Sequence, residues 1–298
     1  MSVGFVGVGQ MGVHMAARLL SAGHSLVVSD LDPGAAVPLV THGATWAESP
    51  AEVAEVCRMV LTCLPTPNAV EEVALGEHGL RKGWRPGDLY VDLSTNSPST
   101  VRSIAAKAKA LGVDMLDSPV SGGTKGAEAG TLTLMVGGAA PVLERARPVL
   151  EPAAGKIFHV GEIGCGNVAK LVNNMIGLTC NSICAEGFVL GVKAGIGPQM
   201  LYELLSVSTA DNWSLRQYPR TVFQRDFAPG FKISLANKDM SLALGLGEEF
   251  GVFLPVARAV KRDLEDSIAR GRADQGVDAV ILALEETAQI EVGQRRSE

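Results

Sequence analysis

Apolar positions in residues 2–160 fall into short runs that are separated by amphipathic stretches. The runs are rich in β-branched residues, as buried strands are, and most of the stretches between them repeat apolar residues at helical spacing. The predicted strands are 3–7, 25–30, 58–64, 88–93, 113–118, 131–137 and 156–160, and the predicted helices include 10–22, 97–110 and 140–150. This alternation predicts a doubly wound, mainly parallel α/β sheet with helices on both faces.

The pattern changes after Gly164, where the strand signal disappears. Helical periodicity then predicts helices at 164–193, 198–206, 234–250, 254–270 and 276–286. We therefore predict an α/β domain at residues 1–162 and an all-α domain at residues 163–298, joined by a long interdomain helix. The polar end of the chain, residues 290–298, is expected to fray.

The first long helix after Gly164 carries a polar stripe. Its members follow one another at steps of three, four and seven residues, so they share one face of an otherwise apolar helix: Asn167, Lys170, Asn174 and Asn181. A buried polar group without a partner costs on the order of 1–3 kcal/mol. The stripe therefore predicts partners or chemistry along this face.

Composition narrows the class of protein. The chain has 298 residues, 47% of them hydrophobic, and a formal net charge of -6, which gives no electrostatic reason to bind nucleic acid. The five cysteines form no CxxC pair and the five histidines lack ligand spacing, so we expect neither a metal nor a disulfide. We see no targeting signal and no apolar run long enough for a membrane span, so a cytoplasmic location is expected.

The first predicted strand runs into a glycine-rich turn, Gly7-Val8-Gly9-Gln10-Met11-Gly12. In a GxGxxG turn the first glycine permits the tight bend, the second lets the backbone approach a pyrophosphate, and the third allows close helix packing. Such a turn alone is weak evidence. Here it follows a strand, opens a helix and precedes Asp30, which ends the second strand as ribose recognition requires.

Asp30 also predicts which dinucleotide binds. A carboxylate accepts hydrogen bonds from a free 2′-hydroxyl and repels a 2′-phosphate, and Leu31-Asp32-Pro33 supplies no arginine to neutralise one. NAD is therefore favoured over NADP. The structural alternative, that Asp30 caps the helix after Pro33, is compatible with ribose binding.

Later strand ends continue the pattern of small and polar residues. Leu64-Pro65-Thr66 follows the third strand and Ser94-Thr95 follows the fourth. Each is ordinary turn chemistry alone, but together they would line a bound dinucleotide. Further on, Ser121-Gly122-Gly123 leads into a short helix and offers a hydroxyl and backbone N–H groups to a carboxylate, the alternative being a simple glycine-rich connection.

Six motifs stand in order along the chain. They are Gly7–Gly12, Leu64–Pro67, Asp92–Thr95, the stretch DSPVSGGTKGAEAGTLTLMVGG, Gly164-Cys165-Gly166 with Lys170 and Asn174, and Lys238-Asp239. In this order they resemble the β-hydroxyacid dehydrogenase family, which includes 3-hydroxyisobutyrate dehydrogenase, tartronate semialdehyde reductase and 2-(hydroxymethyl)glutarate dehydrogenase. The resemblance spans nearly the whole chain and implies an amino-terminal Rossmann domain, a helical carboxyl-terminal domain and a homodimer or homotetramer.

The resemblance also implies roles for individual residues. Lys170 corresponds to the catalytic lysine, with Asn174 beside it in catalysis and substrate contact. Substrate contacts also fall on Ser121, Gly122, Gly123 and the pocket tryptophan, Trp213, and a contact that closes over the cofactor falls on Lys238. The structural alternatives are a snorkelling Lys170 and a solvated Lys238-Asp239 pair. Asn181 is expected to bond another helix.

One position departs from the family pattern. Asn212 stands before Trp213 where a small hydroxyl or thiol is usual. If this segment borders the substrate, the amide would favour a polar substituent on the substrate. The alternative is that Asn212 braces its own loop.

These features favour an NAD-dependent enzyme that interconverts a small β-hydroxy acid and its semialdehyde, with Lys170 as general acid and base. Imine reductases share the architecture but generally lack the lysine and the Ser-Gly-Gly loop. Phosphogluconate dehydrogenases need a larger basic phosphate pocket, which we cannot identify. A nucleotide-binding scaffold without catalysis is disfavoured because Lys170 is present.

Overall fold

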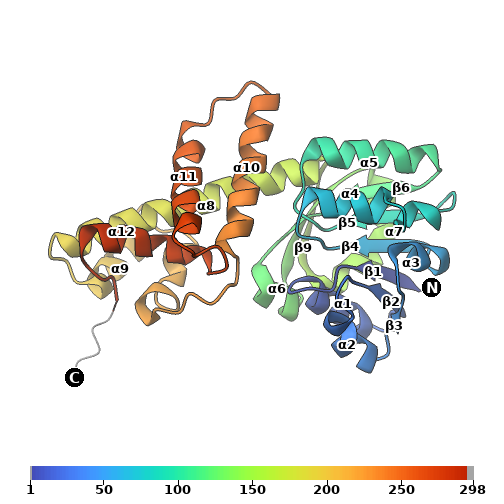
Figure 1. Ribbon diagram of the computed structural model, residues 1–298, viewed down its shortest axis with the longest axis horizontal. Helices are drawn as coiled ribbons and strands as arrows, with labels where there is room; N and C mark the ends of the chain where they lie inside the picture. Colours follow the sequence, from blue (N-terminus) through green and yellow to red (C-terminus); the bar gives the residue numbers. More distant parts are fainter. Residues whose placement is uncertain (1, 294–298) are drawn as a thin grey trace. The chain divides into compact units, whose positions relative to one another are not determined.

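The computed structural model describes residues 2–293 (Figure 1). The chain divides into two compact units, Met1–Lys170 and Leu171–Glu298. Helix α8 (Cys165–Lys193) contributes residues to both. The domain boundary predicted between residues 162 and 163 lies before this helix and stays a prediction. Most of the predicted frayed tail lies outside the described residues.

The first unit is built on a nine-stranded sheet. The strand order is β3-β2-β1-β4-β5-β6-β8-β7, with β9 paired to β8. Neighbours from β3 to β6 are parallel, as are β8 and β9, whereas β8 runs antiparallel to β6 and β7. The strands are β1 Val3–Val6, β2 Leu26–Ser29, β3 Thr45–Trp46, β4 Met59–Thr62, β5 Leu89–Asp92, β6 Asp114–Asp117, β7 Val120–Ser121, β8 Leu132–Gly137 and β9 Ala154–Gly161. This confirms the predicted doubly wound, mainly parallel sheet.

Helices of the first unit connect successive strands. They are α1 Gly12–Ser21, α2 Pro33–Thr41, α3 Pro50–Val56, α4 Pro67–Leu75, α5 Pro98–Ala110, α6 Gly123–Ala129 and α7 Ala140–Leu150. Four of them begin with a proline directly after a side-chain cap, which is provided by Asp32, Ser49, Thr66 and Ser97. Proline suits this position because its missing N–H would be unpaired there, and the cap satisfies one of the other N–H groups.

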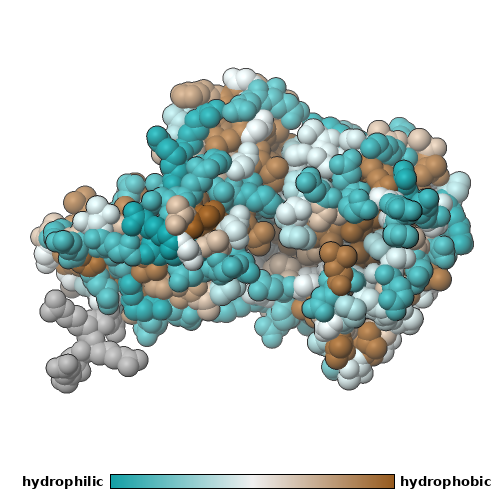
Figure 2. All heavy atoms as spheres, in the orientation of Figure 1, coloured by the Kyte–Doolittle hydropathy of each residue, from teal (hydrophilic) through white to brown (hydrophobic). Residues whose placement is uncertain are grey.

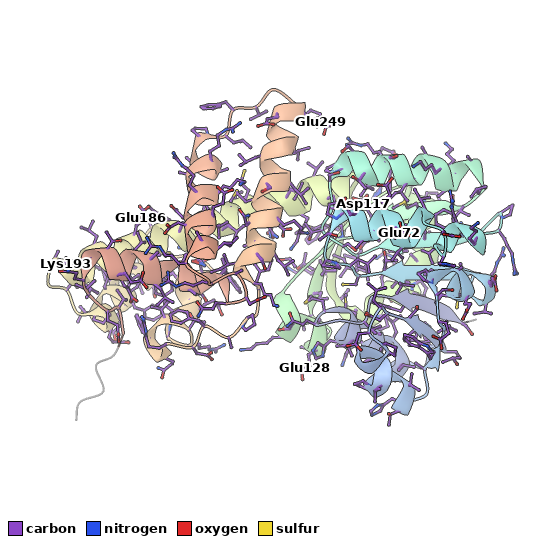
Figure 3. The ribbon with its side chains drawn as sticks, viewed as in Figure 1. Glu72, Asp117, Glu128, Glu186, Lys193 and Glu249 are labelled. Atoms are coloured by element: carbon purple, nitrogen blue, oxygen red, sulfur yellow. The ribbon has the colours of Figure 1, made fainter. Side chains whose placement is uncertain are left out.

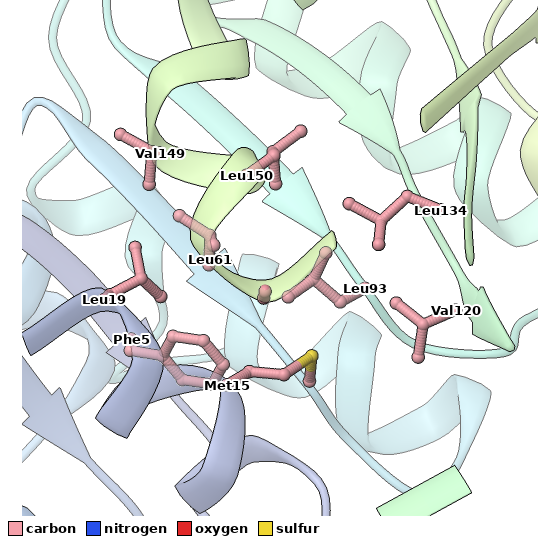
Figure 4. Close-up of a pocket in the computed structure, with 10 residues that line it drawn as sticks. Phe5, Met15, Leu19, Leu61, Leu93, Val120, Leu134, Val149 and Leu150 are labelled. Carbon is pink, nitrogen blue, oxygen red and sulfur yellow. The ribbon is translucent and has the colours of Figure 1, made fainter. Parts of the chain in front are cut away.

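The central strands separate two apolar cores. Phe5 packs with Met15 of α1, whereas the next residue, Val6, packs with Val60 in a second cluster, because successive strand residues point to opposite faces. A cavity of about 10 Å³ in the first core is lined only by apolar side chains, Leu134 among them (Figure 4). It offers no polar partner to a ligand, so it is a packing void and not a binding site.

The second unit is helical, as predicted. Besides most of α8 it contains α9 Pro198–Ser206, α10 Ile233–Glu249, α11 Pro255–Ala269 and α12 Ile281–Ala288, with 3₁₀ segments at Leu215–Gln217, Val222–Gln224 and Val277–Val280. Helices α10 and α11 lie side by side (Figure 1). Buried residues such as Phe188, Tyr218 and Met240 form the core of this unit.

Helix α8 is long and apolar enough to cross a membrane by length and hydropathy alone. Its best window has a mean hydropathy of 1.5, and 39% of that window is buried. We expected no uninterrupted apolar run of this length, and α8 is interrupted by Lys170, Asn174 and Glu186, which a test of length and mean hydropathy tolerates. Core helices pass the same test, and Leu178 and Phe188 of α8 are buried in the second core, so the test is weak evidence for a membrane.

Candidate active site

The turn after β1 has the geometry of a dinucleotide-binding loop. Gly7 has φ +90°, and a Cβ there would lie 2.4 Å from the Cys63 carbonyl oxygen. A Cβ on Gly12, where α1 begins, would lie 1.9 Å from the Gly7 carbonyl oxygen. A Cβ on Gly9 would meet nothing within 4 Å. Gly7 and Gly12 are therefore needed for the turn itself, whereas Gly9 leaves open space for a ligand.

Gln10 and Met11 complete this turn. Gln10 is exposed and Met11 half-buried, and α1 begins directly after them. The exposed residues Gly9 and Gln10 thus lie just before the helix N-terminus, where a pyrophosphate would bind.

The carboxylate of Asp30 is fixed beside the glycine turn by backbone hydrogen bonds. Its Oδ2 accepts a hydrogen bond from the Val8 backbone N–H at 2.7 Å, and its Oδ1 accepts one from the Asp32 N–H at 3.0 Å. The cap of α2 is Asp32, which accepts from the Gly34 N–H at 2.9 Å, so the alternative that Asp30 caps this helix is wrong. Each oxygen of Asp30 keeps acceptor capacity for a ribose hydroxyl.

The ends of β4 and β5 are tied to each other. The Leu64 backbone N–H donates to Oγ of Ser94 at 2.9 Å. Pro65 is exposed, Thr66 caps α4 by accepting from the Ala69 N–H at 3.2 Å, and Thr95 is half-buried. Because β2, β1, β4 and β5 are consecutive in the sheet, their end residues gather at one edge, where doubly wound sheets bind ligands.

A buried carboxylate, Asp92, lies at the end of β5. Burial raises its pKa to about 6, although Ser94 and the hydroxyl of Thr62 hydrogen-bond to it. Its second oxygen, Oδ2, has no hydrogen-bond partner. The sequence motif contains Asp92, but only its burial identifies a carboxyl group that titrates near neutral pH.

The Ser121–Gly123 loop requires its glycines. Ser121 ends β7 and is half-buried, while Gly122 has φ +136° and Gly123 has φ +64°. Two consecutive residues with positive φ make a sharp, exposed turn that a residue with a side chain would strain. The loop thus leaves a hydroxyl and backbone N–H groups accessible on the first unit.

Asparagines of the polar stripe on α8 have specific partners. Asn167 is fully buried and bonds Asp117, whereas Asn181 donates to Oδ1 of Asp278 at 3.0 Å. Asn181 thus bonds another element of the second unit, which agrees with its expected role. Lys170 is half-buried and lies on the same helix face as Asn167.

In the second unit, Asn174 is linked to α10. Its Nδ2 donates to Oδ2 of Asp239 at 2.6 Å, and Nζ of Lys238 lies 3.0 Å from the other oxygen of that carboxylate. The side chains of Lys238 and Asp239 are only 20% and 4% exposed. The alternative of a solvated pair on a surface helix is therefore wrong.

The segment before Trp213 braces itself. Oδ1 of Asn212 accepts from the Leu215 N–H at 3.0 Å, and its Nδ2 donates to the Ala210 carbonyl oxygen at 2.9 Å. The amide is thus engaged in its own loop, and the hypothesis that it selects polar substrates loses its basis. Trp213 itself is 70% exposed in the described chain.

No group of three His, Cys, Asp or Glu residues within residues 2–293 could hold a metal ion. The five cysteines are free. Burial raises the pKa of the Cys63 thiol to about 12, so it is a poor nucleophile.

A doubly wound sheet with this strand edge defines a dinucleotide-binding oxidoreductase domain. Residues 2–161 match the family model of the NAD binding domain of 6-phosphogluconate dehydrogenase. Residues 164–284 match the model described as NAD-binding of NADP-dependent 3-hydroxyisobutyrate dehydrogenase. The chain belongs to the β-hydroxyacid dehydrogenase family and is an NAD-dependent oxidoreductase of that class.

Characterised relatives are similar to this chain over nearly its full length. A 3-hydroxyisobutyrate dehydrogenase of Pseudomonas aeruginosa is 40% identical over 284 residues, which are 93% of this chain and 95% of that protein. A 2-(hydroxymethyl)glutarate dehydrogenase of Eubacterium barkeri is 38% identical over 97% of both chains. The solved Mycobacterium tuberculosis 3-hydroxyisobutyrate dehydrogenase with L-serine superposes with a TM-score of 0.88 at 37% identity, covering 95% of this chain and 98% of that one. These relatives favour a hydroxyacid dehydrogenase over an imine reductase.

Proposed function

We propose that the protein oxidises the terminal hydroxyl of a small β-hydroxy acid to the semialdehyde, or reduces it in reverse, with Lys170 as general base and acid. The observation that carries this proposal is a half-buried lysine, one turn before the anchored amide of Asn174 on α8, in a chain whose strand edge fits NAD. An amine in this place can accept a proton from a substrate hydroxyl and return it.

The proposed reaction needs a hydride acceptor, a group that takes the proton and groups that bind the substrate. Bound NAD supplies the acceptor for the hydride that leaves the substrate carbon. Lys170 takes the hydroxyl proton and returns it in reduction. Asn174 donates one Nδ2 hydrogen to Asp239, which leaves the second for a substrate oxygen. Ser121 and the N–H groups of Gly122 and Gly123 bind the substrate carboxylate.

Cofactor contacts follow the strand edge of the first unit. The Gly7–Gly12 turn binds the pyrophosphate and Asp30 binds the adenosine ribose, while the loops after β4 and β5 line the rest of the dinucleotide. Lys238 in the cofactor site and Trp213 in the substrate pocket rest on the family match alone.

The test is NADH formation with a panel of β-hydroxy acids, including 3-hydroxyisobutyrate, L-serine and 2-(hydroxymethyl)glutarate. We expect turnover of at least one acid, and a loss of about 10²–10⁴-fold in kcat in Lys170→Ala with NAD binding nearly unchanged. A protein that binds NAD but oxidises no acid in the panel would be a nucleotide-binding scaffold, and the proposal would be wrong.

We further propose a homodimer or homotetramer, in the cytoplasm. Four large apolar side chains on α8 stay exposed in the described chain at steps of four and seven residues: Val172 (43%), Ile176 (56%), Ile183 (58%) and Leu190 (72%). Figure 2 shows apolar patches that interrupt the polar surface of the second unit. Apolar faces of this kind mark protein contacts. Light scattering should give a mass above one chain, and a monomer at all concentrations would contradict the proposal.

A further inference from the structure

The start of α8 is fastened to the end of β6 by one carboxylate, Asp117, which is fully buried (Figure 3). Its Oδ1 accepts from the Gly164 backbone N–H at 2.7 Å. Its Oδ2 accepts from the backbone N–H of Asn167 at 2.7 Å and from Nδ2 of Asn167 at 3.2 Å. The first N–H groups of a helix lack partners within the helix, and negative charge is favoured there, so this carboxylate fixes where α8 begins.

Asn167 makes a second connection, to the loop after β5. Its Oδ1 accepts from the Asn96 backbone N–H at 2.6 Å. The residues just before Asn96 are Ser94 and Thr95, which the proposed function assigns to the cofactor. One buried amide therefore joins the first turn of α8 to a loop of the cofactor edge.

The start of α8 and the strands beside it approach each other closely at two glycines. A Cβ on Gly166 would lie 2.4 Å from the Met135 carbonyl oxygen and 2.6 Å from that of Asp117. A Cβ on Gly137 would lie 2.4 Å from Oδ1 of Asp117. The glycines allow the helix turn and the strands to approach without side chains between them, which leaves the Asp117 carboxylate within hydrogen-bond distance of the N–H groups at the helix start.

We propose that Asp117 and Asn167 are positioning residues that hold Lys170 against the Ser94–Asn96 loop. Lys170 is three residues after Asn167, so both lie on one face of the same helix. Loss of the hydrogen bonds of the Asp117 carboxylate or of the Asn167 amide lets the first turn of α8 shift. A displacement of about 1 Å of a catalytic group can cost about 10²-fold in rate. This inference rests on the proposed role of Lys170.

The matched control is on the same helix. Asn181 is 3% exposed and donates to the carboxylate of Asp278 at 3.0 Å, so Asn181→Ala also removes an amide-carboxylate bond of α8. It lies three turns beyond Lys170. A purely structural loss should therefore appear in both variants, whereas a positional loss should appear only near Lys170.

Asn167→Ala should lower kcat by about 10–100-fold. We expect Asn181→Ala to keep kcat within about twofold of the natural protein, with a comparable fall in Tm. The limb of the kcat profile against pH that reports Lys170 should move in Asn167→Ala alone. Equal kcat values in the two variants at matched Tm would overturn the inference.

A measurement without substrate separates this inference from the proposed function. Lysines are reductively ¹³C-methylated in the full chain, the Lys170 signal is assigned with Lys170→Arg, and its titration is followed by NMR. A shifted midpoint in Asn167→Ala, but not in Asn181→Ala, supports positioning even if no β-hydroxy acid is oxidised. An unchanged midpoint overturns it. Should Asn167→Ala fail to fold, the milder Asn167→Ser and the isosteric Asp117→Asn are read by the same criteria.

Discussion

Two buried carboxylates, one in each unit, bind asparagines of the same helix in different ways. Asp117 accepts two backbone N–H groups and one amide N–H at the start of α8. Asp239 accepts one amide N–H from Asn174 and faces the ammonium of Lys238. The first arrangement determines the path of the main chain. The second determines only how two side chains point.

Removing each carboxylate in turn should destabilise the protein by different amounts. Asp117→Ala leaves two backbone N–H groups and an amide unpaired in a buried place, so we expect a loss of about 3 kcal/mol or more in the free energy of unfolding. Asp239→Ala releases one amide and a partly exposed ammonium, for which about 1–2 kcal/mol is expected. Denaturant unfolding of each variant in the full chain would measure the two losses in the free energy of unfolding. Equal losses would contradict the distinction.

A third buried carboxylate, Asp92, should make stability depend on pH. Burial raises its pKa to about 6, above the ordinary value of 3.8, so the folded state holds this proton more tightly than the unfolded state. The resulting stability is fully present below about pH 4 and is lost as pH rises through about 6. Asp92→Asn should therefore be more stable than the natural protein at pH 8, by on the order of 1–2 kcal/mol, and should lose that advantage near pH 4. Thermal unfolding at both pH values checks this, and a variant that is less stable at pH 8 would contradict it.

The smallest expected effect concerns Asp30, a half-buried carboxylate that accepts hydrogen bonds from two backbone N–H groups. NAD should give at least about tenfold higher kcat/KM than NADP, a difference of about 1.4 kcal/mol. Asp30→Ala should weaken this preference because it removes both the hydrogen-bond acceptor and the repelling charge. NADP preference in the natural protein would show that Asp30 does not face the ribose.

Much of the fold was predictable because periodicity is a local property. Residues 198–206 form a helix as predicted, and α8 begins one residue after the predicted start. The sequence did not reveal β3 and β7, which are two residues long and are defined only by their pairing with β2 and β8. The predicted helix at 276–286 is divided into a 3₁₀ segment and α12.

The candidate site was predictable where function follows from one segment, as in the glycine turn and Asp30. The hydrogen-bond partners of the polar stripe on α8 could not be predicted, because they lie far away in the sequence. Asn167 bonds a carboxylate 50 positions earlier in the chain, and Asn174 bonds one 65 positions later. The departure at Asn212 favours substrate selection, but the amide bonds its loop neighbours Ala210 and Leu215 and the thiol of Cys184 on α8, partners that only the folded chain brings together.

The claim that Lys170 moves the proton is tested most directly by chemical rescue. Lys170→Ala is assayed for NADH formation with saturating NAD and a β-hydroxy acid that the natural protein oxidises, in increasing concentrations of small primary amines. We expect a slow variant whose rate rises with amine concentration and with amine basicity, because the free amine replaces the missing base. A variant that folds, binds NAD and oxidises the acid at close to the natural rate without any amine would contradict the account.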